Sequence, residues 1–463
     1  MPILAGFMVP HPPMIVPAVG RGSEKQVEKT TRAYEQAAEE IAALRPDTII
    51  ITSPHATMYA DYFHISPGRS AHGDFGQFRA GQESYRVDYD AELTSLISKL
   101  AREKGFPAGV MGERDRKLDH GTMVPLYFIR KAYPEMCKIV RIGLSGLPLT
   151  EHYRLGQMIR EAVDILGRRA VFVASGDLSH KLQSYGPYGF AAEGPQYDER
   201  IMDVCSRAAF GELFDFEESF CEKAAECGHR SFVIMAGAFD GLVVKATQLS
   251  HEDVTGVGYG ICTFYPGEPD ESRHFLAQYL VKASEKLSAA RAQEDPYVQL
   301  ARKTVEMYVR DRVKPEVPAG LPPEMLSTRA GAFVSIHEHG KLRGCIGTIA
   351  PVRSCVAQEI IDNAVSASTR DPRFEPITAD ELEWLEISVD VLGEAEPIAS
   401  PAELDVKRYG VIVTKGTKRG LLLPDLDGVD TVEQQIAIAK SKAGIADWDK
   451  KVQLERFEVV RHH

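Results

Sequence analysis

The stretch ILAGFMV at residues 3–9, followed by Pro10 and His11, decides how this chain folds. A short apolar run that ends at a proline is typical of a strand buried inside a parallel sheet. Similar runs recur as TIIIT at 48–52 and AVFVA at 170–174. Because these strand-like runs alternate with helical segments, the sequence predicts an α/β domain with a central, largely parallel sheet flanked by helices.

Bulk composition narrows the class of protein. The chain has 463 residues, enough for two or three domains, and its net charge of −12 argues against a general nucleic-acid binder. No stretch reaches the roughly 20 apolar residues that cross a bilayer, so we expect no membrane partner. Seven cysteines without framework spacing, and an N-terminus without signal-peptide features, suit a reducing compartment. We therefore expect a cytoplasmic protein.

Helical and strand-like patterns divide the chain into two domains. In the first domain they predict amphipathic helices at 26–44, 90–104 and 151–167, and a fourth within 221–244. They also predict a closing strand at 258–264. The segment PGEPD at 266–270 is expected to end this pattern. We predict an α/β domain at 1–268, a linker with a connecting helix at 269–294 and an α+β domain at 295–463. Each domain is large enough to fold independently.

Two histidines directly follow apolar runs, each behind a proline. His11 lies in VPHPP and His55 lies in SPHA. Because the carboxyl ends of parallel strands meet at one edge of a sheet, both side chains can share one pocket. Imidazoles there favour a metal centre or proton-transfer chemistry. An Fe(II) ion with open positions needs a carboxylate as third ligand, and the candidate is Glu226. The alternative for Glu226 is a carboxylate that the dipole of the following helix favours.

Two further segments carry a family resemblance. LDHGTMVPL at 118–126 and SGDLSH at 175–180 resemble motifs of the LigB-type, class III extradiol ring-cleaving dioxygenases. The resemblance extends over about residues 3–265. It implies an oxidoreductase with non-haem Fe(II) that cleaves a small aromatic diol, such as a catechol, with dioxygen.

The resemblance also assigns roles to individual residues. The implied metal ligands are His11, His55 and Glu226. His120, in the expected loop 118–121, and His180 become acid–base residues that face the substrate and bound oxygen, with Asp177 as a third catalytic candidate. This division is chemically reasonable because a catechol must lose protons to chelate a metal, and a neutral histidine can accept one near pH 7.

The same region also resembles Memo-type proteins, which share the fold. In those proteins a Cys-Gly pair lies near the position of Glu226, and this chain has Cys227 and Gly228 there. A thiolate ligand from Cys227 would favour copper or zinc and a redox or modification role without ring cleavage. His229 is another candidate ligand, or a polar residue at the start of a helix. A third alternative is a non-enzymatic scaffold, which would have no need of this set of histidines.

The motif LRGCIG at 342–347 marks the second domain. Its two glycines allow close backbone approach around Cys345, and a neighbouring Arg343 favours the thiolate. Together with DPRF at 371–374, the motif resembles an AMMECR-type domain over about residues 295–461. That family implies no settled reaction. The sequence leaves open whether Arg343, Cys345, Asp371 and Arg373 form a pocket for an anionic small molecule or have a purely structural role.

The combination of domains suggests one protein partner. AMMECR-type domains occur beside Memo-like and radical-SAM proteins in the AmmeMemoRadiSam system, which this chain resembles. It has no Cys-x3-Cys-x2-Cys motif for an iron–sulfur cluster, so a radical-SAM partner would be a separate protein. Association of the chain into a homo-oligomer stays open.

Overall fold

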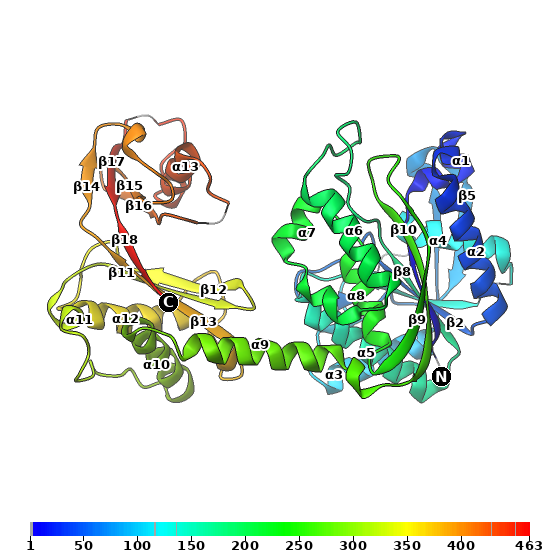
Figure 1. Cartoon of the computed structure of the whole chain (residues 1–463), viewed down its shortest axis with the longest axis horizontal. Coiled ribbons are helices and arrows are strands. Elements are labelled where there is room, and N and C mark those ends of the chain that lie inside the picture. Colours follow the sequence, from blue (N-terminus) through cyan, green and yellow to red (C-terminus); the bar gives the residue numbers. More distant parts are fainter. Residues whose placement is uncertain (1–2, 115–116, 136, 427, 450) are drawn as a thin grey trace. The chain divides into compact units, whose positions relative to one another are not determined.

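The chain folds into two units, Met1–Leu280 and Val281–His463. The computed structural model describes residues 3–114, 117–135, 137–426, 428–449 and 451–463 (Figure 1). The division between the units falls within the predicted linker at 269–294. Among the described residues, no helix combines the length and apolar character needed to cross a membrane.

A six-stranded sheet in the order β7-β2-β8-β1-β10-β9 forms the centre of the first unit. Strands β7, β2, β8 and β1 run parallel, and β10 and β9 add an antiparallel edge. The prediction of a largely parallel sheet is therefore confirmed. The strands are β1 (Ile3–Val9), β2 (Thr48–Ser53), β7 (Lys138–Gly143), β8 (Ala170–Ser175), β9 (Leu242–Glu252) and β10 (Tyr259–Pro269).

Helices cover both faces of this sheet (Figure 1). In β2, Ile50 joins a core with one set of helices, while Ile49 and Ile51 join a core with the other set. Both faces are apolar because successive side chains of a strand point to opposite sides. On the Ile50 side lie α3 (Ala91–Glu103), α5 (Leu149–Leu166), α6 (Glu193–Ser206) and α8 (His229–Ala238). On the other side lie α2 (Glu28–Leu44) and α4 (His120–Ala132).

Two local expectations are wrong. His120 does not lie in a loop but is the first residue of α4, because the Asp119 carboxylate accepts the Thr122 backbone N–H at 2.9 Å and caps the helix. The segment PGEPD does not end its strand, since β10 continues to Pro269. The last partner of β10 in β1 is Phe264, so the prolines beyond it remove no hydrogen bond to β1.

Shorter elements complete the first unit. They are α1 (Pro17–Gly20), β3 (Phe63–His64), β4 (Ser70–Phe75), β5 (Ala80–Asp88), β6 (Ala108–Gly109) and α7 (Glu218–Ala224). The connecting helix α9 (Phe275–Arg291) crosses the division between the units. Its first turns belong to the first unit, where Leu276 is buried in the core.

The second unit contains two antiparallel sheets, as the α+β prediction requires. The first has the order β12-β11-β13-β18 and the second β14-β17-β15-β16. Helices α10 and α12 cover one face of the first sheet. The elements are α10 (Pro296–Asp311), α11 (Pro323–Ser327), β11 (Ala332–Glu338), β12 (Lys341–Gly347), α12 (Val356–Thr369), β13 (Leu385–Leu392), β14 (Glu396–Ile398), β15 (Gly410–Lys415), β16 (Lys418–Leu422), α13 (Val432–Lys442), β17 (Gln453–Phe457) and β18 (Val459–His462).

Candidate metal centre

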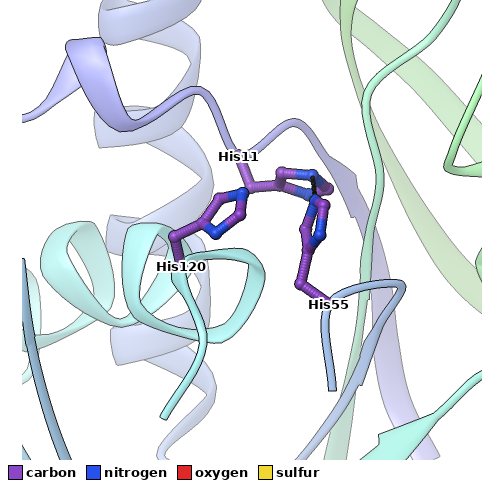
Figure 2. A group of neighbouring side chains, drawn as sticks. All are labelled: His11, His55 and His120. Carbon is purple, nitrogen blue, oxygen red and sulfur yellow. Dashed lines mark hydrogen bonds between the residues drawn. The ribbon is translucent and has the colours of Figure 1, made fainter. Parts of the chain in front are cut away.

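Three histidine rings converge beyond the carboxyl ends of the parallel strands (Figure 2). His11 follows β1, His55 follows β2, and His120 opens α4. The Nε2 atoms of His11 and His55 lie 3.1 Å apart, and the ring centroids of His55 and His120 lie 4.0 Å apart. The two strands bring their histidines together because both are neighbours of β8 in the sheet.

Ser175, at the end of β8, orients the His11 ring. Its hydroxyl donates to the Gly121 carbonyl oxygen at 2.6 Å and lies 3.0 Å from His11 Nδ1. Because a hydroxyl has one proton to donate, Ser175 accepts the hydrogen of Nδ1. His11 Nε2 is then left with its lone pair, directed toward His55. A hydrogen bond of this kind to the other ring nitrogen is typical of metal-binding histidines.

Asp177 and Cys227 approach His11 as well. The Asp177 carboxylate accepts the backbone N–H of His11 at 2.7 Å, and Cys227 Sγ lies 3.6 Å from His11 Nε2. Two glycines allow this approach, since a Cβ on Gly176 would lie 2.1 Å from the Cα of Gly228. Any larger residue at either position would push the segment that carries Cys227 away from the end of β8.

The described residues contain two groups of three candidate ligands, and His11 belongs to both. One group is His11, His55 and His120, and the other is His11, Asp177 and Cys227, with the ligand atoms of each group within 4.8 Å of one another. Around one tetrahedral zinc ion, two nitrogens lie roughly 3.3 Å apart, and a nitrogen and a sulfur roughly 3.6 Å apart. The distances from His11 Nε2 to His55 and to Cys227 each fit these values, but His55 and Cys227 do not belong to one group.

Glu226, the third ligand expected from the sequence, belongs to neither group. Its carboxylate accepts the backbone N–H of His229 at 2.6 Å, at the start of α8. Burial raises the pKa of Glu226, and the His229 N–H and Arg230 partly oppose this. The His229 ring also lies away from the cluster, with its nitrogens 2.9 Å from the Leu213 carbonyl oxygen and 3.3 Å from a tyrosine hydroxyl. In this structure both residues stabilise the start of α8.

His180 faces the same site from the loop after β8. Its ring stacks on Tyr188 with centroids 5.1 Å apart, and it interacts electrostatically with Asp177 and His55. Its Nε2 atom is buried and has no hydrogen-bond partner among the described residues. A buried polar atom without a partner is uncommon in proteins and is consistent with a group that awaits a substrate.

Burial keeps the imidazoles of His11 and His120 neutral at pH 7. Burial, together with the neighbouring histidines, lowers the pKa of His11 and of His120 to about 3. Burial also lowers the pKa of His180, although the Asp177 carboxylate opposes this. The neutral imidazole is the form that binds a metal or accepts a proton. Burial raises the pKa of the Cys227 thiol, and a cation beside the sulfur would favour the thiolate instead.

The candidate residues of the second unit are only partly brought together. The Asp371 carboxylate accepts the Cys345 backbone N–H at 2.9 Å and pairs with Arg373. Arg343 is directed elsewhere, because its guanidinium forms an ion pair with Glu381 at 2.6 Å. Cys345, Asp371 and Arg373 therefore form one cluster, and Arg343 belongs to another.

The sequence interpretation overlooked two residues that position the centre. Ser175 orients His11, and Asp119 caps α4 beside a buried Arg141 at 3.6 Å. Ser175 lies in SGDLSH and Asp119 lies in LDHGTMVPL. The signal for Asp119 was the pattern Asp-x-x-Thr, which is typical of a helix N-terminus.

Comparison with known proteins agrees with the resemblance. Residues 5–262 match the family described as the catalytic LigB subunit of aromatic ring-opening dioxygenase, and residues 298–462 match AMMECR1. Protein CA_C1420 of Clostridium acetobutylicum is 42% identical over 465 residues, which cover 98% of each chain. A protein of Thermotoga maritima is 52% identical over 36% of this chain and 98% of its own length.

A named enzyme subunit is also similar. The 2-aminophenol 1,6-dioxygenase beta subunit of a Pseudomonas species is 29% identical, over 56% of this chain and 92% of its own length. The match to LigB covers more than half of the chain, and the relative from Clostridium matches both domains together. The chain therefore belongs to the LigB family of aromatic ring-opening dioxygenase subunits, with an AMMECR1 domain fused behind its LigB domain.

Proposed function

We propose that the N-terminal domain is a metal-dependent oxidoreductase whose metal is held by His11, Asp177 and Cys227, the candidate ligand group that contains the thiol. The observation that carries this proposal is the position of His11 Nε2, 3.6 Å from Cys227 Sγ and 4.0 Å from Asp177 Oδ2. A mixed nitrogen, oxygen and sulfur donor set suits copper, zinc or iron. A bound ion would supply a Lewis acid at this point, and iron or copper would add redox chemistry.

The remaining polar groups suit a substrate that carries hydroxyl protons. His120 and His180 are neutral, and Nε2 of His180 has no partner among the described residues. Each can accept a proton from a phenolic hydroxyl and return it later. Small aromatic diols or aminophenols are the proposed substrates, and the similarity to the 2-aminophenol dioxygenase subunit supports that class.

The second candidate is an extradiol dioxygenase with Fe(II) held by His11, His55 and Glu226. The same similarity favours it. It requires the Glu226 carboxylate to leave the His229 N–H, which it accepts at 2.6 Å. We rank this candidate second because that carboxylate already has a partner, while the Cys227 thiol lies beside His11.

Metal content decides between the two candidates. Protein purified without oxygen is compared as wild type, Cys227→Ser, Glu226→Gln and His120→Ala, and Cys221→Ser is the control for loss of another half-buried free thiol. We expect the metal to be lost only in Cys227→Ser, and oxygen uptake on addition of a catechol or an aminophenol to be lost with it. Iron lost in Glu226→Gln and kept in Cys227→Ser, with catechol-dependent oxygen uptake, establishes the second candidate. Metal lost in His120→Ala makes the all-histidine group the binding site.

We also propose that the protein acts in the cytoplasm beside a separate radical-SAM protein. The free thiols of all seven cysteines support a reducing compartment, and the fusion of the two domains supports the partnership. Affinity purification of the tagged chain from its own cells, without oxygen, tests for that partner. Recovery of the chain without any iron–sulfur protein contradicts it.

A further inference from the structure

In the second unit, the thiol of Cys345 lies on the sheet face that faces away from α12. The neighbouring Gly344 faces α12, since a Cβ there would lie 2.2 Å from the Ala367 carbonyl oxygen. Successive side chains of a strand point to opposite faces, so Cys345 points away from the helix. Ser335 is the cross-strand partner of Cys345, and its hydroxyl donates to Sγ at 3.3 Å.

The segment after α12 holds Cys345 in place. Strand β12 is at the edge of its sheet, so the outward backbone groups of Cys345 have no neighbouring strand. Asp371 accepts the Cys345 N–H at 2.9 Å, and Arg373 donates to the Cys345 carbonyl oxygen at 3.2 Å. Arg373 also binds the Asp371 carboxylate at 2.9 and 2.7 Å. The guanidinium of Arg373 is therefore fixed beside the thiol, with which it also interacts directly.

A second cation, from a distant part of the chain, lies near the Cys345 thiol. Lys442 is the last residue of α13, and its ammonium group interacts electrostatically with both Cys345 and Arg373. Lys442 is exposed. The Asp371 charge is balanced by Arg373, which leaves Lys442 as a further cation near the thiol.

We propose that Cys345 is the reactive thiol of a binding site for a small anionic molecule, whose negative group lies between Lys442 and Arg373. The Ser335 hydroxyl, on the neighbouring strand β11, donates a hydrogen bond to the sulfur. Cations beside a nucleophile raise the local concentration of anionic reactants. The site lies in the AMMECR1 domain and is independent of the metal centre proposed above.

Charge-selective alkylation of the full chain tests this proposal. The sulfur displaces iodide from negatively charged iodoacetate or from neutral iodoacetamide, so that a carbon–sulfur bond replaces the carbon–iodine bond and the thiol proton passes to solvent. Both reagents present the same reactive carbon. The ratio of their rates at Cys345, measured by peptide mass spectrometry, therefore reports the local charge. The same cysteine in the urea-unfolded chain provides the reference ratio.

We expect the iodoacetate-to-iodoacetamide ratio to be higher in the folded chain than in the unfolded chain. Lys442→Gln should lower it roughly twofold to fivefold, as removal of one charge near the surface does. Lys407→Gln, which removes an exposed lysine elsewhere in the same unit, should leave it unchanged. Inorganic phosphate should slow alkylation of the wild type more than that of Lys442→Gln. Equal ratios in the wild type and Lys442→Gln, or equal ratios in folded and unfolded chain, would overturn the proposal.

Discussion

The Nε2 atoms of His11 and His55 lie 3.1 Å apart although 44 positions of sequence separate the two residues. Both follow strands that flank β8, and Ser175 at the end of β8 orients the His11 ring. The candidate metal centre is thus built on the edge of a rigid sheet. Binding residues in such a position depend on backbone geometry more than on the conformation of a long loop.

His11 and His180 are expected to have different roles in the same site. His11→Ala should lose the metal, because His11 is common to both candidate ligand groups. His180→Ala should keep the metal and lose about 10²- to 10⁴-fold in turnover, as removal of an acid–base group does. Metal analysis and oxygen uptake measure the two effects, with His72→Ala on an exposed position as control. Loss of metal in His180→Ala would reverse the assignment.

Asp119 is expected to stabilise the fold and to position His120. Its carboxylate caps α4 and lies 3.6 Å from the buried Arg141 guanidinium. Asp119→Ala should lower the free energy of unfolding by about 3–5 kcal/mol, because the buried Arg141 guanidinium loses its neighbouring carboxylate. Asp90 caps α3 and pairs with Arg168, far from the histidines in the chain. Urea denaturation should show that both alanine variants are less stable, and only Asp119→Ala should also slow turnover per bound metal.

Asp371 should make the second unit sensitive to acid. Hydrogen bonds from Arg373 lower the pKa of Asp371 from 3.8 to about 2. A carboxyl group with a lowered pKa in the folded state stabilises it above the unfolded pKa, and this contribution is lost as the pH falls from about 4 to 2. The expected loss is about 2 kcal/mol. The only two tryptophans, Trp384 and Trp448, lie in this unit, so tryptophan fluorescence reports its unfolding in urea. Asp371→Asn should lack this slope, and an unchanged slope contradicts the assignment.

The two domains should fold separately, and the beginning of α9 should belong to the first. Fragments 1–268 and 295–463 are both expected to be soluble. Leu276 is 5% exposed in the core of the first unit, and Tyr279 stacks on Phe214 with centroids 4.7 Å apart. Fragment 1–280 should therefore be more stable than 1–268 by about 1.5–3 kcal/mol, the value of one buried leucine. Thermal unfolding measures this difference. Equal midpoints would place α9 outside the first core.

Local sequence patterns predicted most of the helices and strands that build the sheet and its covering layers. The helix expected at 90–104 is α3 at Ala91–Glu103, and that at 151–167 is α5 at Leu149–Leu166. These predictions succeeded because amphipathic periodicity and capping residues act within a few positions. The strand β10 was predicted too short. Whether a proline can continue a strand depends on which neighbour needs its N–H, and that neighbour, β1, is more than 200 residues away in the sequence.

The sequence by itself determined that His11, His55 and Asp177 would stand beyond the carboxyl ends of parallel strands, because apolar runs of that length form a parallel sheet with one common edge. Only the tertiary structure decided which of Glu226 and Cys227 faces His11. The two are adjacent in the chain, and their directions depend on the backbone N–H of His229 and on the contact between Gly176 and Gly228.

The tertiary structure alone also decided that Lys442 lies near Cys345. The two residues are almost a hundred positions apart, and no local sequence pattern predicts how their segments pack.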